Sequence, residues 1–252
     1  MSQEQKQPSI EALIAEHEPG HALDQRFYTD PAIFELELDR IITRNWILAG
    51  HVSELAEPGD FKVVEVARES AIIVRGKDGS IRAFANVCRH RGSLVCLEKS
   101  GNTRKFACPY HGWTYDTDGR LIAARSMPDG FDKSGYSLRP VSYGEIHGLM
   151  FVCFCDDPPS LDGAVRDLEE PMALFDFPNL KVAANKTYDI PANWKLSIEN
   201  YQECYHCATA HPEYARLHTL MLDPSKRPRV QQDMLAKMQA CGLKEIFIDY
   251  LD

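Results

Sequence analysis

The chain has 252 residues, of which 44% are hydrophobic and 26% charged, a composition typical of globular proteins and sufficient for one large domain or two small ones. The formal net charge of −9 argues against a nucleic-acid-binding surface, and no run of about 18 apolar residues predicts a membrane span. The polar N-terminal sequence lacks the apolar segment of a signal peptide. Eight cysteines without an export signal indicate the reducing cytoplasm, where cysteines bind metals or pack in the core.

In chain order, the pattern predicts a loose polar arm at residues 1–28 and then a helix. Thr29-Asp30-Pro31 favours a helix start, because Asp caps helices and Pro suits their first turn. From Trp46 onward, β-branched residues and turn signals predict short strands. The strands are expected at 61–66, 71–75, 81–86, 113–115, 120–122 and 149–154.

A second part of the chain is expected after the turn-forming residues 156–160. Residues 184–190 predict a strand, and residues 231–241 have the apolar spacing of a helix. The changes of pattern divide the sequence into an N-terminal arm and helix at 1–45, a β-rich domain at 46–157, and a mixed domain at 158–252.

Two short pairs of cysteine and histidine lie in the β-rich region. Cys88 and His90 form the first pair, and Cys108 and His111 form the second. Such a set can hold zinc, or a 2Fe–2S centre in which two histidines bind one iron and two cysteines the other. Because each pair contributes one residue of each kind, the pattern favours a two-iron cluster held between two loops.

A second group of metal-binding residue types lies in the segment 193–212. Glu203 and His206 are three residues apart, so they share a face if this segment is helical. His211 is rotated off that face and Pro212 interrupts the helix, so a distorted helix end is needed to bring the imidazoles together. Two histidines and a carboxylate are the ligands of non-haem Fe(II) oxygenases, although the pattern alone is also typical of structural histidines.

Taken together, the motifs resemble those of the ring-hydroxylating oxygenase α subunits with a Rieske centre. The sequences Cys-Arg-His-Arg-Gly and Cys-Pro-Tyr-His-Gly-Trp are similar to the family's cluster signature. The segments 193–195 and 203–212 are similar to its catalytic iron segment. The resemblance implies an α+β protein, with an all-β Rieske domain followed by part of a catalytic domain whose antiparallel sheet is flanked by helices in a helix-grip-like fold.

The resemblance also implies a role for each candidate residue. Cys88 and Cys108 are expected to bind one iron of the cluster, His90 and His111 the other, and His206 and His211 the catalytic iron. Glu203 falls where the family has an Asp that links the catalytic site to the Rieske histidine of the neighbouring subunit. A Glu at this position is similar to the branch that acts on quaternary amines such as carnitine or glycine betaine.

Length limits this resemblance. Family members continue well beyond 252 residues and take their third iron ligand, an Asp, from a later helix. We therefore expect a C-terminally truncated member of the family. Two alternatives stay open: Glu203 is itself the carboxylate ligand, or the chain only transfers electrons and has no oxygenase activity.

The implied function is oxygen activation at a mononuclear Fe(II), by a monooxygenase or a dioxygenase. Electrons would come from NAD(P)H through a separate flavin/iron–sulfur reductase and then through the 2Fe–2S cluster. The family assembles head to tail, so a homotrimer is expected. The substrate would be a small molecule, either an aromatic compound that is hydroxylated or a quaternary amine that is oxidatively demethylated. A structural zinc module is a more distant alternative.

Overall fold

The computed structural model describes residues 9–173, 175–203, 206–217 and 224–226, together with single positions at 229, 232, 233, 236 and 240. The chain divides into two compact units. One unit comprises Ala32–Lys186, and the other combines Met1–Pro31 with Thr187–Asp252. The helix expected at 231–241 falls almost entirely outside the described residues.

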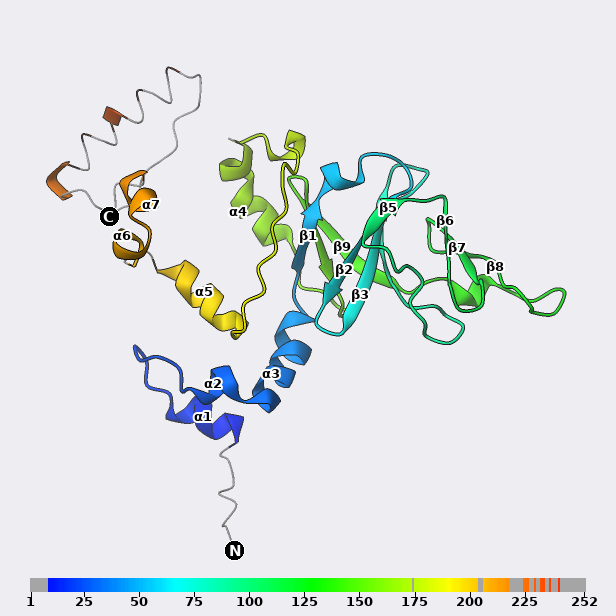
Figure 1. The fold of residues 1–252 in the computed structure, drawn as a ribbon, viewed down its shortest axis with the longest axis horizontal. Helices are drawn as coiled ribbons and strands as arrows, with labels where there is room; N and C mark the ends of the chain where they lie inside the picture. Colours follow the sequence, from blue (N-terminus) through cyan, green and yellow to red (C-terminus); the bar gives the residue numbers. More distant parts are fainter. Residues whose placement is uncertain are drawn as a thin grey trace, which may run out of the picture. The chain divides into compact units, whose positions relative to one another are not determined.

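A seven-stranded antiparallel sheet forms the larger unit, with the strand order β1-β10-β9-β4-β3-β2-β5 (Figure 1). Its strands are β1 (Ile47–His51), β2 (Asp60–Val66), β3 (Glu69–Arg75), β4 (Ile81–Ala85), β5 (Ser100–Asn102), β9 (Pro140–Ile146) and β10 (Leu149–Cys153). The strands expected at 61–66, 71–75, 81–86 and 149–154 are confirmed with shifts of one or two residues at their ends.

Strand β3 is buried on both faces of this sheet, which explains its continuous apolar sequence. Ile72 and Val74 pack into one hydrophobic cluster, whereas Ile73 packs into another, because successive side chains of a strand point to opposite faces. The cluster around Ile73 also contains Ala49, Leu55, Ala83, Met150 and Val152.

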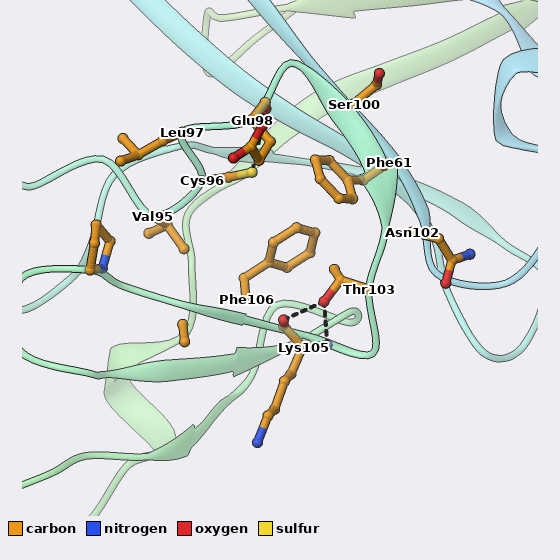
Figure 2. Close-up of a pocket in the computed structure, with 13 residues that line it drawn as sticks. Phe61, Val95, Cys96, Leu97, Glu98, Ser100, Asn102, Thr103, Lys105 and Phe106 are labelled. Atoms are coloured by element: carbon orange, nitrogen blue, oxygen red, sulfur yellow. Dashed lines mark hydrogen bonds between the residues drawn. The ribbon is translucent and has the colours of Figure 1, made fainter.

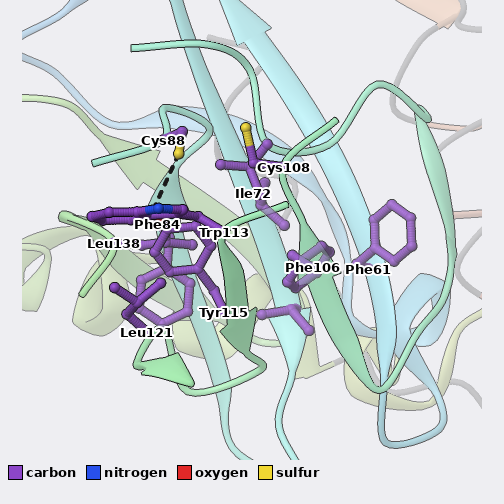
Figure 3. Packing of buried hydrophobic residues seen from close by; sticks show 12 residues of the cluster. Phe61, Ile72, Phe84, Cys88, Phe106, Cys108, Trp113, Tyr115, Leu121 and Leu138 are labelled. Atoms are coloured by element: carbon purple, nitrogen blue, oxygen red, sulfur yellow. Dashed lines mark hydrogen bonds between the residues drawn. The ribbon is translucent and has the colours of Figure 1, made fainter. Parts of the chain in front are cut away.

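A three-stranded sheet covers the other cluster. It consists of β6 (Lys105–Ala107), β7 (Thr114–Asp116) and β8 (Leu121–Ala123), so the hairpin expected at 113–122 is confirmed. Gly119 turns this hairpin with a φ of +87°, and a Cβ at this position would lie 2.5 Å from the ring of Phe84. We call the buried set the cluster core (Figure 3): Phe61, Ile72, Val74, Phe84, Cys88, Val95, Phe106, Cys108, Trp113, Tyr115, Leu121 and Leu138.

The N-terminal residues are more ordered than the expected loose arm, and this expectation was wrong for the described residues from 9 onward. Helix α1 (Ile10–Glu16) begins where the Ser9 side chain accepts from the backbone N–H of Ala12, and α2 (Arg26–Thr29) is a single turn. Helix α3 (Pro31–Glu37) begins at Pro31 as expected and continues into a π-helical turn at Leu38–Ile42. The polar composition concealed α1 because only one of its residues, Leu13, is buried.

The segment that follows β10 remains attached to the larger unit. Trp46 Nε1 donates to the Pro159 carbonyl at 2.6 Å, and His51 Nε2 lies 2.9 Å from the Phe177 carbonyl. Helix α4 (Asp162–Ala173) lies between these two anchors. The compact unit therefore extends to Lys186, past the turn at 156–160.

The strand expected at 184–190 does not form. These residues are exposed and have no regular secondary structure. A strand requires a partner for its backbone hydrogen bonds, and none of the described strands pairs with these residues.

The second unit is helical where it is described. Besides α1 and α2, it contains α5 (Trp194–Gln202), α6 (Cys207–Ala210) and α7 (Pro212–Leu217), followed by a 3-10 turn at Pro224–Lys226. Tyr28 ties the N-terminal segment to α5, since its hydroxyl donates to Glu199 at 2.7 Å and its carbonyl accepts from Asn193 at 3.2 Å. Within the described ranges, no helix has both the length and the apolar character needed to cross a bilayer.

Candidate metal centres

The two Cys–His segments form loops with the same backbone hydrogen bonds. In the first, Cys88 N–H donates to the residue five positions later, Ser93, at 2.8 Å, and Gly92 N–H returns to the Cys88 carbonyl at 3.0 Å. In the second, Cys108 N–H donates to Trp113 at 2.8 Å and Gly112 N–H returns to Cys108 at 2.9 Å. Both glycines have a positive φ, +73° and +71°, which only glycine adopts without strain. The sequence therefore builds two equivalent turns, each beginning at a cysteine.

Asn86 anchors the backbone next to the first Cys–His loop through side-chain hydrogen bonds, a role that the sequence did not reveal. It is only 1% exposed. Its Oδ1 accepts from the backbone N–H groups of Val95 and Cys96 at 3.1 and 2.8 Å. Its Nδ2 donates to the Cys96 carbonyl at 2.8 Å and to Ser70 Oγ at 3.2 Å. One buried amide thus ties the residues that follow the loop, Val95 and Cys96, to the residue that precedes it and to β3, and no pattern in the sequence distinguishes this asparagine.

The loops bring the four candidate cluster ligands to one edge of the cluster core. Cys88 and Cys108 are both buried, and Figure 3 shows them at the same edge of the packed side chains. The rings of His90 and His111 meet edge to face, with centroids 4.6 Å apart. His90 also stacks on Trp113 at 4.8 Å between ring centroids. The structure thus groups a pair of sulfurs and a pair of imidazoles.

The hydrogen bonding and the pKa of His90 are those expected of a metal ligand. Its Nδ1 is buried and has no hydrogen-bond partner among the described residues. Burial, and secondarily the nearby charge of His111, lowers the pKa of His90 below its ordinary value. A neutral imidazole with a buried, unsatisfied nitrogen is the form that binds a metal ion. These residues therefore fit a 2Fe–2S cluster.

In the described part of the chain, no three Cys, His, Asp or Glu side chains converge as a site for a single metal ion. A 2Fe–2S cluster of this type requires only two protein ligands at each iron. The separate Cys and His pairs satisfy that requirement.

The hydroxyl of Tyr115 contacts the first cysteine. It lies 3.3 Å from Cys88 Sγ and accepts from the backbone N–H of Arg89 at 3.0 Å. Burial, followed by the contact with Cys88, raises the pKa of Tyr115 well above its ordinary value, so the hydroxyl keeps its proton. Either group can donate while Cys88 is a thiol, but a cluster-bound Cys88 would be a thiolate, which can only accept, so the Tyr115 hydroxyl would then donate to it. Tyr115 was not identified from the sequence.

A separate cavity of about 420 Å³ lies beside β5 and β6 (Figure 2). Phe61 and Phe106 line it and contact each other edge to face, with centroids 5.4 Å apart. Cys96 also lines this cavity, and its thiol donates to the Glu98 carbonyl at 3.5 Å. Burial raises the pKa of the Cys96 thiol, which therefore stays protonated at neutral pH.

The second candidate centre lies at a break between helices, and the expectation of a common helical face was wrong. Helix α5 ends at Gln202, and Glu203 has extended backbone angles (φ −125°, ψ 143°). His206 precedes α6, and His211 ends α6 immediately before α7 begins at Pro212. The three side chains come from two helix junctions, that of α5 with α6 and that of α6 with α7.

These junctions nevertheless place Glu203 against His206, and the ring of His211 beside the ring of His206. Glu203 Oε1 lies 2.5 Å from His206 Nδ1, and Oε2 accepts from the His206 backbone N–H at 3.4 Å. The rings of His206 and His211 meet edge to face at 5.6 Å between centroids. All three line a cavity of about 510 Å³ with Asn200, Tyr201, Cys207, Ala210, Glu213 and Tyr214. Two imidazoles, one of them oriented by a carboxylate, fit a mononuclear iron site.

Comparison with known families agrees with both centres. Residues 45–154 match the Rieske [2Fe-2S] domain, and residues 177–245 match the catalytic domain of the ring hydroxylating alpha subunit. The chain is 40% identical over 233 residues to the glycine betaine monooxygenase oxygenase subunit of Chromohalobacter salexigens, covering 90% of this chain and 52% of the relative. It is 36% identical to the carnitine monooxygenase oxygenase subunit of Escherichia coli, covering 81% of this chain and 56% of the relative.

Solved structures show the same relationship. The quaternary ammonium Rieske monooxygenase CntA in complex with L-carnitine matches with a TM-score of 0.69 and 39% identity, over 76% of this chain and 55% of CntA. Naphthalene 1,2-dioxygenase from Rhodococcus matches with a TM-score of 0.67 and 33% identity, over 75% of this chain and 45% of that enzyme. The chain spans about half the length of the relatives that it matches. It therefore belongs to the alpha subunits of the Rieske ring-hydroxylating oxygenases, whose two domains bind a 2Fe–2S cluster and a mononuclear iron.

Proposed function

We propose that the chain provides the Rieske cluster and two ligands of the catalytic iron in an oxygenase that acts on a quaternary amine. The main support for this proposal is the contact between Glu203 and His206, which lies beside His211 in the same cavity. The similarity of the chain to glycine betaine and carnitine monooxygenase oxygenase subunits supports a quaternary amine as the substrate class. Matches to both domains favour this activity over electron transfer alone.

For the cluster, we assign Cys88 and Cys108 to one iron and His90 and His111 to the other. The unsatisfied Nδ1 of His90 supports this assignment. The cluster supplies one electron at a time when it is bound. The buried cysteines exclude water from one side of the site, and Tyr115 donates its proton toward Cys88.

For the catalytic iron, we assign His206 and His211 as ligands and Glu203 as the residue that orients His206. Because Glu203 occupies Nδ1 of His206, the other ring nitrogen, Nε2, is left to bind metal. The bound iron would activate O2 for substrate oxidation. We also propose that the Glu203 carboxylate, which contacts His206 Nδ1, links this site to the cluster histidine of a neighbouring subunit.

The same cavity has the side chains that a quaternary ammonium group needs. Tyr201 and Tyr214 line it, and tyrosine faces attract quaternary cations. Glu203 and Glu213 add negative charge to the wall. A quaternary ammonium cannot donate a conventional hydrogen bond, so ring faces and carboxylates are suited to hold it. An aromatic substrate would gain nothing from the two carboxylates.

The remaining elements of the proposal follow from the family. The chain would act as a cytoplasmic homotrimer with a flavin/iron–sulfur reductase that draws electrons from NAD(P)H. Cluster and catalytic iron would then meet across subunits. The proposed domain limits remain 1–45, 46–157 for the Rieske domain and 158–252 for the beginning of the catalytic domain.

The first test is the metal content of the chain purified without oxygen. Two irons and two acid-labile sulfides per cluster are expected, with a reduction potential within about −150 to +300 mV. One tetrahedral zinc bound to Cys88, His90, Cys108 and His111 would refute the cluster assignment.

A second test addresses the substrate class. The chain, extended to the length of its relatives, is supplied with a reductase and NADH. Glycine betaine, carnitine and naphthalene are compared by O2 consumption coupled to product formation. Coupled turnover of a quaternary amine is expected. Turnover of naphthalene alone would overturn the substrate class while leaving the oxygenase assignment intact.

A further inference from the structure

A pair of thiols lies at the end of β10, outside both candidate metal centres. Cys153 is the last residue of the strand and is fully buried. Cys155 follows two positions later, where the chain bends, and is partly exposed. Their sulfur atoms are 3.3 Å apart. The two thiols therefore face each other directly.

The surroundings hold both thiols only weakly. Cys153 Sγ lies 3.9 Å from the Thr43 carbonyl, and Cys155 Sγ lies 3.7 Å from the Arg44 carbonyl. Both cysteines line a cavity of about 460 Å³ whose wall also includes Cys88 and Arg89 of the first cluster loop. A reagent that enters this cavity reaches the more exposed thiol, Cys155, without unfolding the sheet.

The backbone permits a bond between the two sulfurs. Alternate residues of a fully extended strand are at most about 6.8 Å apart at Cα, which is the upper limit that disulfides tolerate. Bond formation requires the sulfurs to approach from 3.3 Å to roughly 2.05 Å, a change within reach of side-chain rotation.

We propose that Cys153 and Cys155 form a reversible disulfide site that is oxidised by low-molecular-weight disulfides. The Cys155 thiolate attacks one sulfur of glutathione disulfide and displaces a glutathione thiolate. The Cys153 sulfur then attacks Cys155 in the mixed disulfide and releases the second glutathione. The protein dithiol loses two electrons and two protons, and glutathione disulfide becomes two molecules of glutathione.

The order of the two steps follows from exposure. Cys155 is the accessible thiol, whereas burial raises the pKa of the Cys153 thiol and keeps it protonated until its partner is activated. Cys153 then lies next to the mixed disulfide. Its position favours the intramolecular second step over a lasting glutathione adduct.

The experiment uses the full chain with its iron, treated with glutathione disulfide under anaerobic conditions. Free thiols are then blocked with N-ethylmaleimide, and the tryptic peptide 134–166 is weighed, because it contains Cys153 and Cys155 and no other cysteine. After oxidation this peptide should be lighter by two hydrogens and take up no maleimide. Treatment with dithiothreitol should restore two maleimide groups.

The same digest contains a matched control. Peptide 92–99 contains Cys96 as its only cysteine, so it can take up maleimide or glutathione but cannot lose two hydrogens. The Cys155→Ser variant should abolish the disulfide form of peptide 134–166. Two maleimide groups on this peptide after oxidation, or a stable glutathione adduct beside an unreacted Cys153, would overturn the proposal without depending on how the variant folds.

Discussion

The carboxylate of Glu203 lies 2.5 Å from Nδ1 of His206, across the break that separates α5 from α6. This contact fixes the orientation of the imidazole and satisfies one of its two nitrogens. It connects a residue with extended backbone to a residue at the start of a helix, so neither helix alone could create it. The contact favours an orienting role for Glu203 over direct iron ligation.

We predict that Glu203→Gln in a full-length form retains both iron sites. The amide keeps the shape of the side chain but loses the negative charge, so transfer from the reduced cluster to the catalytic iron should slow by roughly 10–100-fold. Iron content and single-turnover oxidation of the cluster, measured on one sample, provide the readout. Loss of the mononuclear iron would instead identify Glu203 as a ligand. Glu169→Gln, which changes an exposed carboxylate of α4 outside this cavity, is the matched control.

Replacing His206 or His211 with Ala should remove the mononuclear iron and leave the absorption of the Rieske cluster unchanged. Each substitution deletes one imidazole from a site that contains only two in the described residues, and one imidazole does not retain Fe(II). Metal analysis alongside visible absorption distinguishes the two centres. The exposed histidine His17, replaced with Ala, should change neither quantity. Iron in excess of the cluster in the double variant would contradict the assignment.

Tyr115→Phe should lower the reduction potential of the cluster. The Tyr115 hydroxyl oxygen lies 3.3 Å from Cys88 Sγ, and a hydrogen bond donated to a cluster sulfur ligand stabilises the reduced, more negative cluster. A bond of about 1 kcal/mol corresponds to roughly 40 mV for a one-electron couple. A spectroscopic redox titration measures the shift. Tyr136→Phe, at a ring that contacts Trp113 edge to face, should leave the potential almost unchanged.

Asn86→Ala should destabilise the Rieske domain by about 3 kcal/mol. The substitution leaves the buried N–H groups of Val95 and Cys96 without their acceptor, and each unsatisfied group costs roughly 1–3 kcal/mol. The midpoint of thermal unfolding should fall by about 6–12 °C for a domain of this size. Asn102→Ala, an exposed asparagine bonded to Asp60, should cost less than about 1 kcal/mol. Equal effects of the two variants would show that the Asn86 hydrogen bonds do not hold the loop.

The sequence by itself determined the local features of this protein. Alternating and β-branched residues predicted β2, β3, β4 and β10, because these patterns reflect burial on one or both faces of a sheet. The spacing of Cys88, His90, Cys108 and His111 favoured a 2Fe–2S cluster over zinc, because each pair offers one thiolate and one imidazole. Pro31 located the start of α3, because proline fits only the first turn of a helix.

Only the tertiary structure decided which distant groups meet. Asn86 and Tyr115 are ordinary residues in the sequence, and their roles arise because folding buries a polar group that then requires partners. Residues 184–190 have a strand-like sequence, but no described strand pairs with them. Glu203 and His206 meet because α5 ends at Gln202, and not because they share a helical face. The local sequence pattern limits which secondary structure a segment can adopt. Strand pairing and burial against other segments then determine which one it adopts.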